Sequence, residues 1–236
     1  MTLGIHVVDA GVMAFLQQFS QKSAAFNALV IRYMDVPTLK MLPLVCAIWL
    51  LWFGRPASER KRVFLLEGIV AVLATIGVSR LLQALGPERH RPIYANGISG
   101  FLPPIGMRPS PLEDWSSFPS DHAAVVFAIS TVCWRVSRPI GALCYLWSAF
   151  VVCLPRLYAG YHYATDVLAG ALLGVLAVVL LTRVRSIDLA ANRFLKWTEE
   201  RYAGLFYAAA FALSYQIVVL FDDLRRLARE LMSLLA

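Results

Sequence analysis

Charged residues are scarce in this chain. Asp, Glu, Lys and Arg together make up 16% of its 236 residues, whereas 59% are hydrophobic and the mean hydropathy is +0.64. A soluble domain typically carries about 25% charged residues. The shortage of charge therefore disfavours a soluble protein. It predicts an integral membrane protein whose length suits one domain of several helices.

Acidic residues are the scarcer kind, with 15 against 22 basic residues and a formal net charge of +7. No run of basic residues occupies a polar helix face, which a nucleic-acid-binding surface would need. We therefore expect no nucleic-acid partner. The basic excess instead fits loops that face the anionic lipids of a bilayer.

Cysteine pairs and metal-binding spacings are also missing. The four cysteines are Cys46, Cys133, Cys144 and Cys153; all fall in apolar runs, and none belongs to a CxxC pair. Such cysteines are typically buried as small hydrophobic residues. We expect neither a metal site nor a cofactor. The N-terminus lacks a basic region ahead of a short apolar run, so we expect no cleavable signal peptide.

Long apolar runs are what the chain has in abundance. Six are long enough, or nearly so, to cross a hydrocarbon core of about 30 Å as helices. They are residues 37–54, 63–85, 119–134, 139–157, 163–182 and 203–221. The sequence predicts an all-α fold, a polytopic membrane bundle of about six transmembrane helices. Whether the last run spans is left open.

The remaining segments are more polar. Residues 1–36 place apolar side chains at helical spacing among polar ones, which predicts an N-terminal interfacial helix. Residues 86–118 hold six of the twelve prolines and are expected to form a loop. The chain thus divides into this N-terminal region, a membrane core over 37–182 and a C-terminal region over 183–236. That last region holds one further helix and an amphipathic tail.

Polar side chains recur where successive runs end or begin. Because neighbouring helices alternate in direction, all of them fall at one membrane face, where a site is expected. They are Arg80, Arg89, Arg91, Asp121, His122, Arg156, His162 and Asp166. Basic residues of 55–62, 135–138 and 183–201 lie at the other face, which the positive-inside rule makes cytoplasmic. The polar set should therefore face the periplasm or exterior.

The residue types in this set suit phosphoryl transfer. His162 and Asp166 are four apart, so on a helix they share a face, and the carboxylate can orient one imidazole nitrogen while the other attacks. His122 is the candidate general acid for the leaving oxygen. Arg156 and Arg91 can bind phosphate oxygens as planar, permanently charged forks.

The start of the 119–134 run adds further candidates. Ser120 and Asp121 are typical helix starters, and a helix N-terminus also offers free N–H groups to a phosphate. We include both among the phosphate-binding residues, together with Arg80 and Arg89.

Two motifs resemble a known family. The segment Pro119-Ser120-Asp121-His122 and the pattern Arg156-x5-His162-x3-Asp166 are similar to the second and third signatures of the type 2 phosphatidic acid phosphatase superfamily. The resemblance covers about residues 37–182. It implies an all-α membrane core, a phosphohistidine intermediate on His162 and no requirement for a metal.

The chain departs from the family pattern in three places. Pro155 replaces a Ser before Arg156, and Asp121 replaces a Gly. In the first signature, Lys-x6-Arg-Pro, Arg91 is present but Ala84 occupies the Lys position. Arg80 lies one helical turn before Ala84 and could supply the missing cation, with Arg89 as the competitor.

The Asp form of the second signature resembles a bacterial branch that includes undecaprenyl-diphosphate phosphatases. It implies a lipid phosphatase that converts a polyprenyl (undecaprenyl) diphosphate to the monophosphate and phosphate, at the outer face of a bacterial inner membrane. Phosphatidic acid, phosphatidylglycerophosphate and lipid A phosphatases stay open, as does a lipid phosphotransferase. A non-enzymatic transporter or channel is the alternative of another class. The partners implied are a lipid phosphate and the bilayer; no pattern indicates an oligomeric state.

Overall fold

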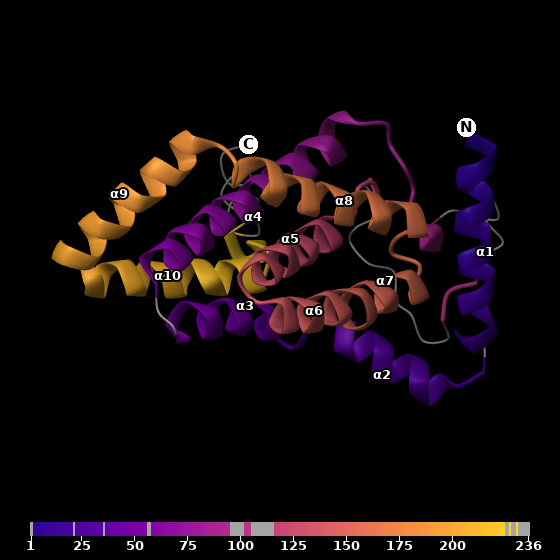
Figure 1. Ribbon diagram of the computed structural model, residues 1–236. Coiled ribbons are helices and arrows are strands. Elements are labelled where there is room, and N and C mark those ends of the chain that lie inside the picture. Colours follow the sequence, from indigo (N-terminus) through magenta and orange to yellow (C-terminus); the bar gives the residue numbers. More distant parts are fainter. Residues whose placement is uncertain are drawn as a thin grey trace.

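The computed structural model describes residues 2–20, 22–34, 36–55, 58–94, 102–104, 116–224, 227 and 230, and these contain helices but no strands (Figure 1). The elements are α1 (Thr2–Ser20), α2 (Ala24–Met34), α3 (Pro37–Phe53), α4 (Glu59–Leu85), the 3₁₀ turn η1 (Pro92–Tyr94), α5 (Asp121–Val136), α6 (Arg138–Leu146), the π-helical η2 (Trp147–Cys153), α7 (Leu154–Tyr158), α8 (Ala164–Leu181), α9 (Arg185–Arg201) and α10 (Ala203–Val218). The all-α class is therefore as predicted.

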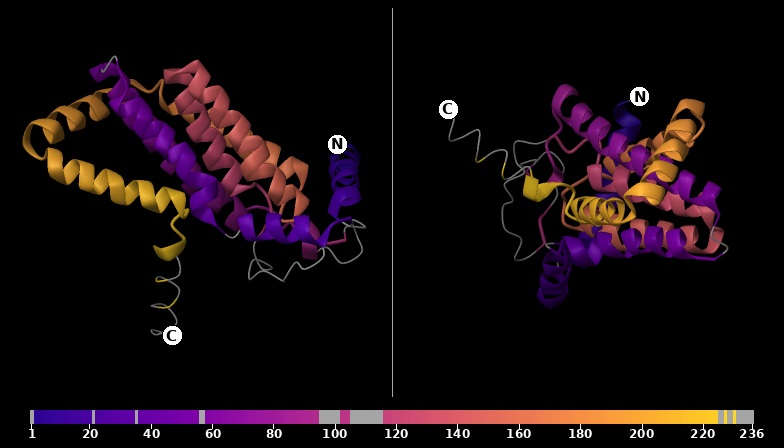
Figure 2. Two further views of the ribbon diagram at one scale, coloured as in Figure 1. Left: turned by 90° about the horizontal axis from the view of Figure 1, so that it is seen from below. Right: turned by 90° about the vertical axis from the view of Figure 1, so that its left-hand side faces the viewer.

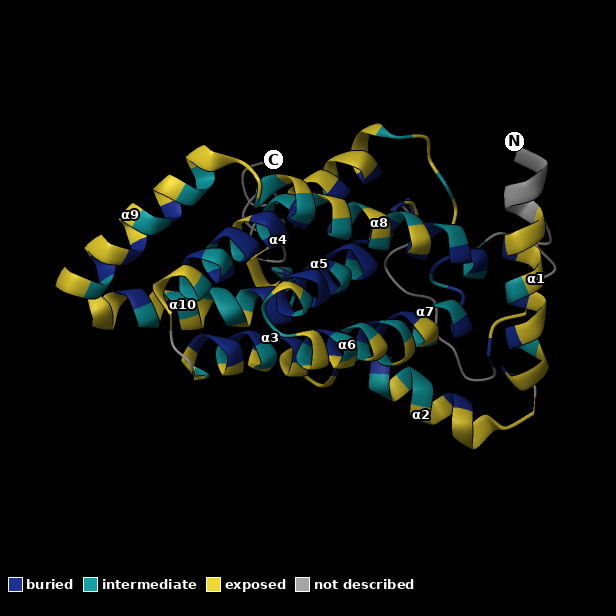
Figure 3. Cartoon of the chain, in the orientation of Figure 1, coloured by how far each residue is buried: buried dark blue, intermediate teal, exposed yellow. Residues whose placement is uncertain are grey.

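Helix α5 forms the centre of the bundle. It is surrounded by α3, α4, α6 and α8, and most of its side chains are buried (Figure 3). Helix α8 approaches it through two glycines. A Cβ at Gly170 would lie 2.3 Å from the Ser120 carbonyl oxygen, and one at Gly174 would lie 2.1 Å from that of Ala124. Only glycine permits this spacing, which sets the distance between the starts of α5 and α8.

The expected six spans are not confirmed. Among the described residues, three helices are long and apolar enough to cross a membrane: α4, the continuous helix Arg138–Tyr158 formed by α6, η2 and α7, and α8. A fourth is possible if α2 and α3, bent by 55° at their junction, count as one broken span. Helices α5 and α10 have 16 residues each. That is short of the ~20 residues that a hydrocarbon core requires.

The two ends of the chain also differ from expectation. The N-terminal region forms two helices, of which α1 packs against α7 and α8, and α2 against α3 and α7. The sequence predicts one further helix and a tail in the region 183–236, but its described part holds two helices, because residues 183–201 are mostly α9. Together α9 and α10 form a V-shaped arm that returns to α3 and α4 (Figure 2). Most of the expected tail helix at 222–236 lies outside the described residues.

Candidate active site

The candidate site lies at the end of the bundle next to α1, where α4 ends, α5 begins and α7 turns into α8 (Figure 1). The sequence predicted that its polar residues meet at one end, and the structure brings them into a connected set. Arg80 contacts Asp121, Arg89 contacts Asp166, and Arg91 contacts His162.

His162 is fully enclosed, with an exposed fraction of 0%, as are Asp166 and Ser120. Its Nδ1 lies 2.9 Å from the carbonyl oxygen of Ser117. Because a carbonyl oxygen can only accept, Nδ1 carries the proton and Nε2 keeps its lone pair. That Nε2 faces the Arg91 guanidinium, with 3.4 Å between Nε2 and Nη1. The geometry thus leaves Nε2 as the atom of His162 that can attack.

The position of Asp166 differs from the predicted one. Helix α8 begins at Ala164, so His162 precedes the helix and does not share a face with Asp166. The Asp166 Oδ2 accepts a 2.8 Å bond from the Tyr163 backbone N–H, and it lies 3.9 Å from His162 Nδ1. That separation exceeds hydrogen-bonding distance.

The orienting contact that the sequence suggested for Asp166 is made instead by the main chain of Ser117. Sequence reasoning missed this contact because a backbone carbonyl has no residue signature.

Two arginines offer unused donors. Arg91 and Arg156 are 5% and 6% exposed, and within the described part of the chain the Nε of each has no hydrogen-bond partner. The Arg91 Nη1 donates to the Tyr161 carbonyl at 2.9 Å, and the Arg156 guanidinium lies 5.7 Å from the Tyr161 ring centroid. Buried donors without acceptors are costly, and an anion would satisfy them.

The other two arginines are already paired with carboxylates. Arg80 donates to Asp121 Oδ2, and also to Gln83 at 3.3 Å. Arg89 donates to Asp166 Oδ1. Both do reach the site, as expected. Whether either replaces the missing lysine stays a prediction, because each guanidinium here binds a neighbouring carboxylate.

His122 stands at the first turn of α5. Its Nδ1 lies 3.1 Å from Asp121 Oδ1, and its backbone N–H donates to the same oxygen at 2.8 Å. Ser120 is the N-cap of α5, as its residue type predicted, with its hydroxyl 3.5 Å from the Ala123 N–H. The Ser120 N–H donates to the Asp166 carbonyl at 3.1 Å, which ties the start of α5 to the start of α8. This bond fixes the two histidine-bearing segments against one another.

Burial, with Arg91 and then Arg156 nearby, lowers the pKa of His162 well below its usual 6.5. The imidazole is therefore neutral at pH 7, as a nucleophile must be. Among the described residues, no three His, Cys, Asp or Glu side chains gather as a metal site would require.

Comparisons with known proteins match the part of the chain that contains the candidate site. The model of the PAP2 superfamily matches residues 68–188, a range that contains all nine predicted site residues. Lipid A 1-diphosphate synthase of Escherichia coli K12 is 28% identical over 180 residues, 72% of each chain. Undecaprenyl-diphosphatase YbjG of the same organism is 30% identical over 140 residues, 58% of this chain and 63% of that protein.

A solved structure shares the fold. The transmembrane PAP2-type phosphatidylglycerolphosphate phosphatase from Bacillus subtilis superposes with a TM-score of 0.51 at 19% identity. The match covers 78% of this chain and 87% of that one. At this identity the likeness concerns the fold alone.

Proposed function

The chain belongs to the PAP2 superfamily, and from this premise we propose that it is a membrane lipid phosphatase acting on a polyprenyl diphosphate such as undecaprenyl diphosphate. The products are the lipid monophosphate and inorganic phosphate. One observation carries the proposal: the unprotonated Nε2 of buried His162 faces a guanidinium, in a site where Arg91 and Arg156 have unsatisfied donors. A terminal phosphoryl group, with three charged oxygens, fits that environment.

In the first step, Nε2 of His162 attacks the terminal phosphorus. A P–N bond forms, and the bond from phosphorus to the bridging oxygen breaks. Arg91 and Arg156 stabilise the charge that spreads over the non-bridging oxygens. Burial and then the charge of Arg156 lower the pKa of His122 to about 3, although Asp121 acts in the opposite direction. The negative charge of a bound diphosphate raises this pKa, and the protonated His122, whose Nδ1 lies 3.1 Å from Asp121 Oδ1, gives its proton to the departing lipid monophosphate.

In the second step, water attacks the phosphohistidine. His122, now neutral, takes a proton from the water as the new P–O bond forms and the P–N bond breaks. Inorganic phosphate leaves and His162 is regenerated. Positive charge comes from arginine throughout, so we propose that the reaction needs no divalent metal.

A second candidate is transfer to another lipid. The relative matched over the larger share of this chain, 72%, is named a lipid A 1-diphosphate synthase. In that reaction the first step is unchanged, and a lipid phosphate replaces water in the second. Phosphatidic acid, lipid A and phosphatidylglycerophosphate phosphatases would also use the first step.

We propose that the protein resides in a bacterial inner membrane with this site facing the periplasm. Support comes from the basic residues of the sequence segments 55–62, 135–138 and 183–201. Helix α4 begins, α5 ends and α9 begins at the end of the bundle opposite the site (Figure 1).

The test is phosphate release from undecaprenyl diphosphate by the purified protein in detergent, with and without lipid A and with excess EDTA. We expect release of phosphate that survives EDTA. His162→Ala should lower the rate by roughly three orders of magnitude or more, because the path itself is removed. Phosphate recovered on lipid A instead of in solution would favour the transferase. A near wild-type rate for His162→Ala would refute the mechanism.

A further inference from the structure

We propose that Asp9, in helix α1, is a positioning residue of the active site: it holds Arg89, and through Arg89 the segment that carries Asp166 and His162. This inference rests on the function proposed above. It extends the site to a helix that lies outside the range matched by the family model, residues 68–188. The sequence had suggested only an interfacial role for that helix.

Asp9 is buried, at 3% exposure, and both of its carboxylate oxygens are used. Oδ1 accepts from the Thr165 backbone N–H at 3.0 Å. Oδ2 accepts from the Thr165 hydroxyl at 2.8 Å and from Arg89 Nη2 at 2.6 Å. If α1 only lay on the surface of the bundle, we would not expect its aspartate to make three contacts with two distant segments of the core.

These contacts place a negative charge at the N-terminus of α8. Thr165 is the second residue of that helix, so its N–H has no partner within the helix. A carboxylate there satisfies the donor and interacts favourably with the helix dipole. Asp9, although it belongs to α1, therefore caps the first turn of α8, which begins just after His162.

Arg89 carries the effect to the reacting residues. Its guanidinium donates to Asp9, to Asp166 and, at 2.9 Å, to the Thr165 hydroxyl, and it lies 4.2 Å from the Tyr163 ring centroid. Without Asp9, one side of this guanidinium has no acceptor. Only the Nη1 contacts with Asp166 and the Thr165 hydroxyl then hold the guanidinium, and the turn that bears His162 loses a constraint.

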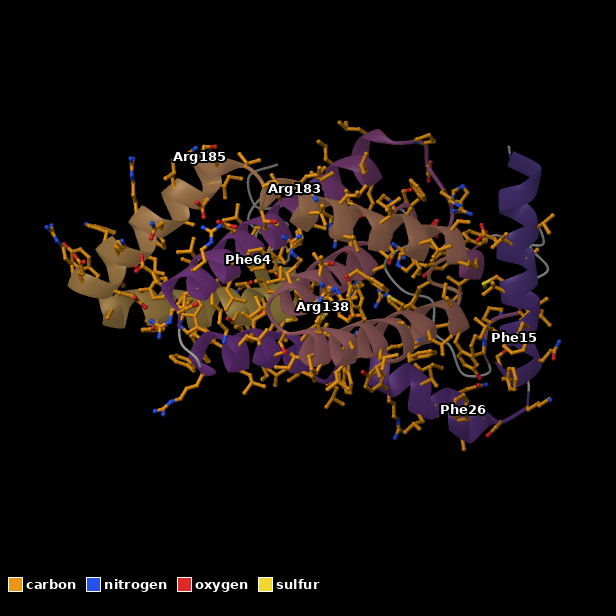
Figure 4. All side chains as sticks on the ribbon, in the orientation of Figure 1. Phe15, Phe26, Phe64, Arg138, Arg183 and Arg185 are labelled. Carbon is orange, nitrogen blue, oxygen red and sulfur yellow. The ribbon has the colours of Figure 1, made fainter. Side chains whose placement is uncertain are left out.

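The chain offers a matched control. Asn27 of α2 is fully buried; its Nδ2 donates to the Ser20 carbonyl at 2.6 Å, and its Oδ1 accepts from the Tyr158 hydroxyl. Phe26 packs edge-on against the Tyr158 ring, 5.7 Å between centroids (Figure 4 labels Phe26). This second anchor docks the same helix pair on α7 without any contact to Arg89.

The experiment compares Asp9→Asn with Asn27→Ala, using phosphate release from farnesyl diphosphate by the full-length protein in detergent. We expect Asp9→Asn to lower kcat about ten- to fiftyfold with KM within about threefold, since a charge-assisted hydrogen bond is lost. Asn27→Ala should lower the melting temperature at least as much while kcat stays within about twofold. Asp9→Glu should recover part of the loss.

A double-mutant cycle then separates positioning from docking. Adding Asp9→Asn to Arg89→Gln should cost little more than Arg89→Gln alone, whereas adding Asn27→Ala should combine independently. If Asp9→Asn fails to fold, Thr165→Val, which keeps the backbone N–H, takes its place in the cycle. Independent effects of Asp9 and Arg89, or equal kcat for Asp9→Asn and Asn27→Ala, would overturn the proposal. An active His162→Ala would instead refute the function on which it rests.

Discussion

The two ends of the helix bundle use arginine in opposite ways. At the site end, Arg91 and Arg156 are at most 6% exposed and keep unsatisfied Nε donors. At the other end, where Figure 4 labels Arg183 and Arg185, the basic side chains other than Lys61 and Arg62 are exposed. Arg62 is 26% exposed and its Nε also lacks a partner within the described residues, but its Nη1 is already paired with Glu199 at 2.7 Å. Arg60 there is 74% exposed and pairs with Asp188, and Lys196 pairs with Glu59 at 3.1 Å, both groups being about half exposed.

The difference separates two functions of the same residue type. A solvated ion pair contributes between about 0 and 1 kcal/mol, so in the topology proposed above the distal arginines need only be positive. Burying a guanidinium is costly in free energy unless hydrogen-bond acceptors satisfy its donors. In the sequence, the arginines of both ends are simply basic residues. Only their burial in the structure distinguishes those that could bind an anion from those that face solvent.

The largest expected effect tests this contrast directly. Arg156→Gln should lower kcat/KM by roughly 100- to 1,000-fold, because it removes a donor aimed at the charge of the transition state in a buried site. The matched change at the other end, Arg60→Gln, should leave kcat/KM within about twofold, since its charge is screened by solvent. Phosphate release from farnesyl diphosphate measures both. Similar losses of kcat/KM for the two variants would show that the arginines at the two ends do not differ in function.

Much of this contrast could be predicted from the sequence, but not its details. The all-helical class, the convergence of the nine site residues and the capping role of Ser120 followed from apolar run lengths and helix-start chemistry. The contact of His162 with the Ser117 carbonyl did not, because a main-chain partner depends on how a distant loop packs. Nor did the role of Asp9, since its partners Arg89 and Thr165 lie 80 and 156 residues away.

The predicted number of spans was not confirmed, for a related reason. Hydropathy cannot distinguish a helix that faces lipid from one that other helices surround. The run 119–134 became α5, which is enclosed by four neighbouring helices and has 16 residues. A central helix is apolar because it is buried in protein, so it need not have the length of a lipid-facing span.

An effect of intermediate size tests the packing that joins the two histidine segments. Gly174→Ala places a Cβ 2.1 Å from the Ala124 carbonyl oxygen, so α8 must move away from α5. We expect a loss of about 1–3 kcal/mol in stability and a lower melting temperature. Gly77→Ala is the control, because nothing lies within 4 Å of its Cβ. It should be neutral, or stabilising by up to ~1 kcal/mol, through helix propensity. Equal melting temperatures for the two variants would contradict the close α5–α8 contact.

The smallest expected effect concerns pH. Burial and the two arginines lower the pKa of His162 in the folded protein, whereas in the unfolded chain it titrates near 6.5. Between pH 8 and 6.5 His162 is neutral in the native state, so kcat/KM should change by less than about twofold from this group. Below about pH 6.5 the unfolded chain binds a proton that the native imidazole does not take up, so the melting temperature should fall with pH. His162→Ala lacks this titration, and its melting temperature should depend less on pH in the same range. Parallel pH dependences of the two proteins would show that neither burial nor the charges of Arg91 and Arg156 lower the pKa of His162. That result would remove the electrostatic basis for treating the buried end of the bundle as an anion site.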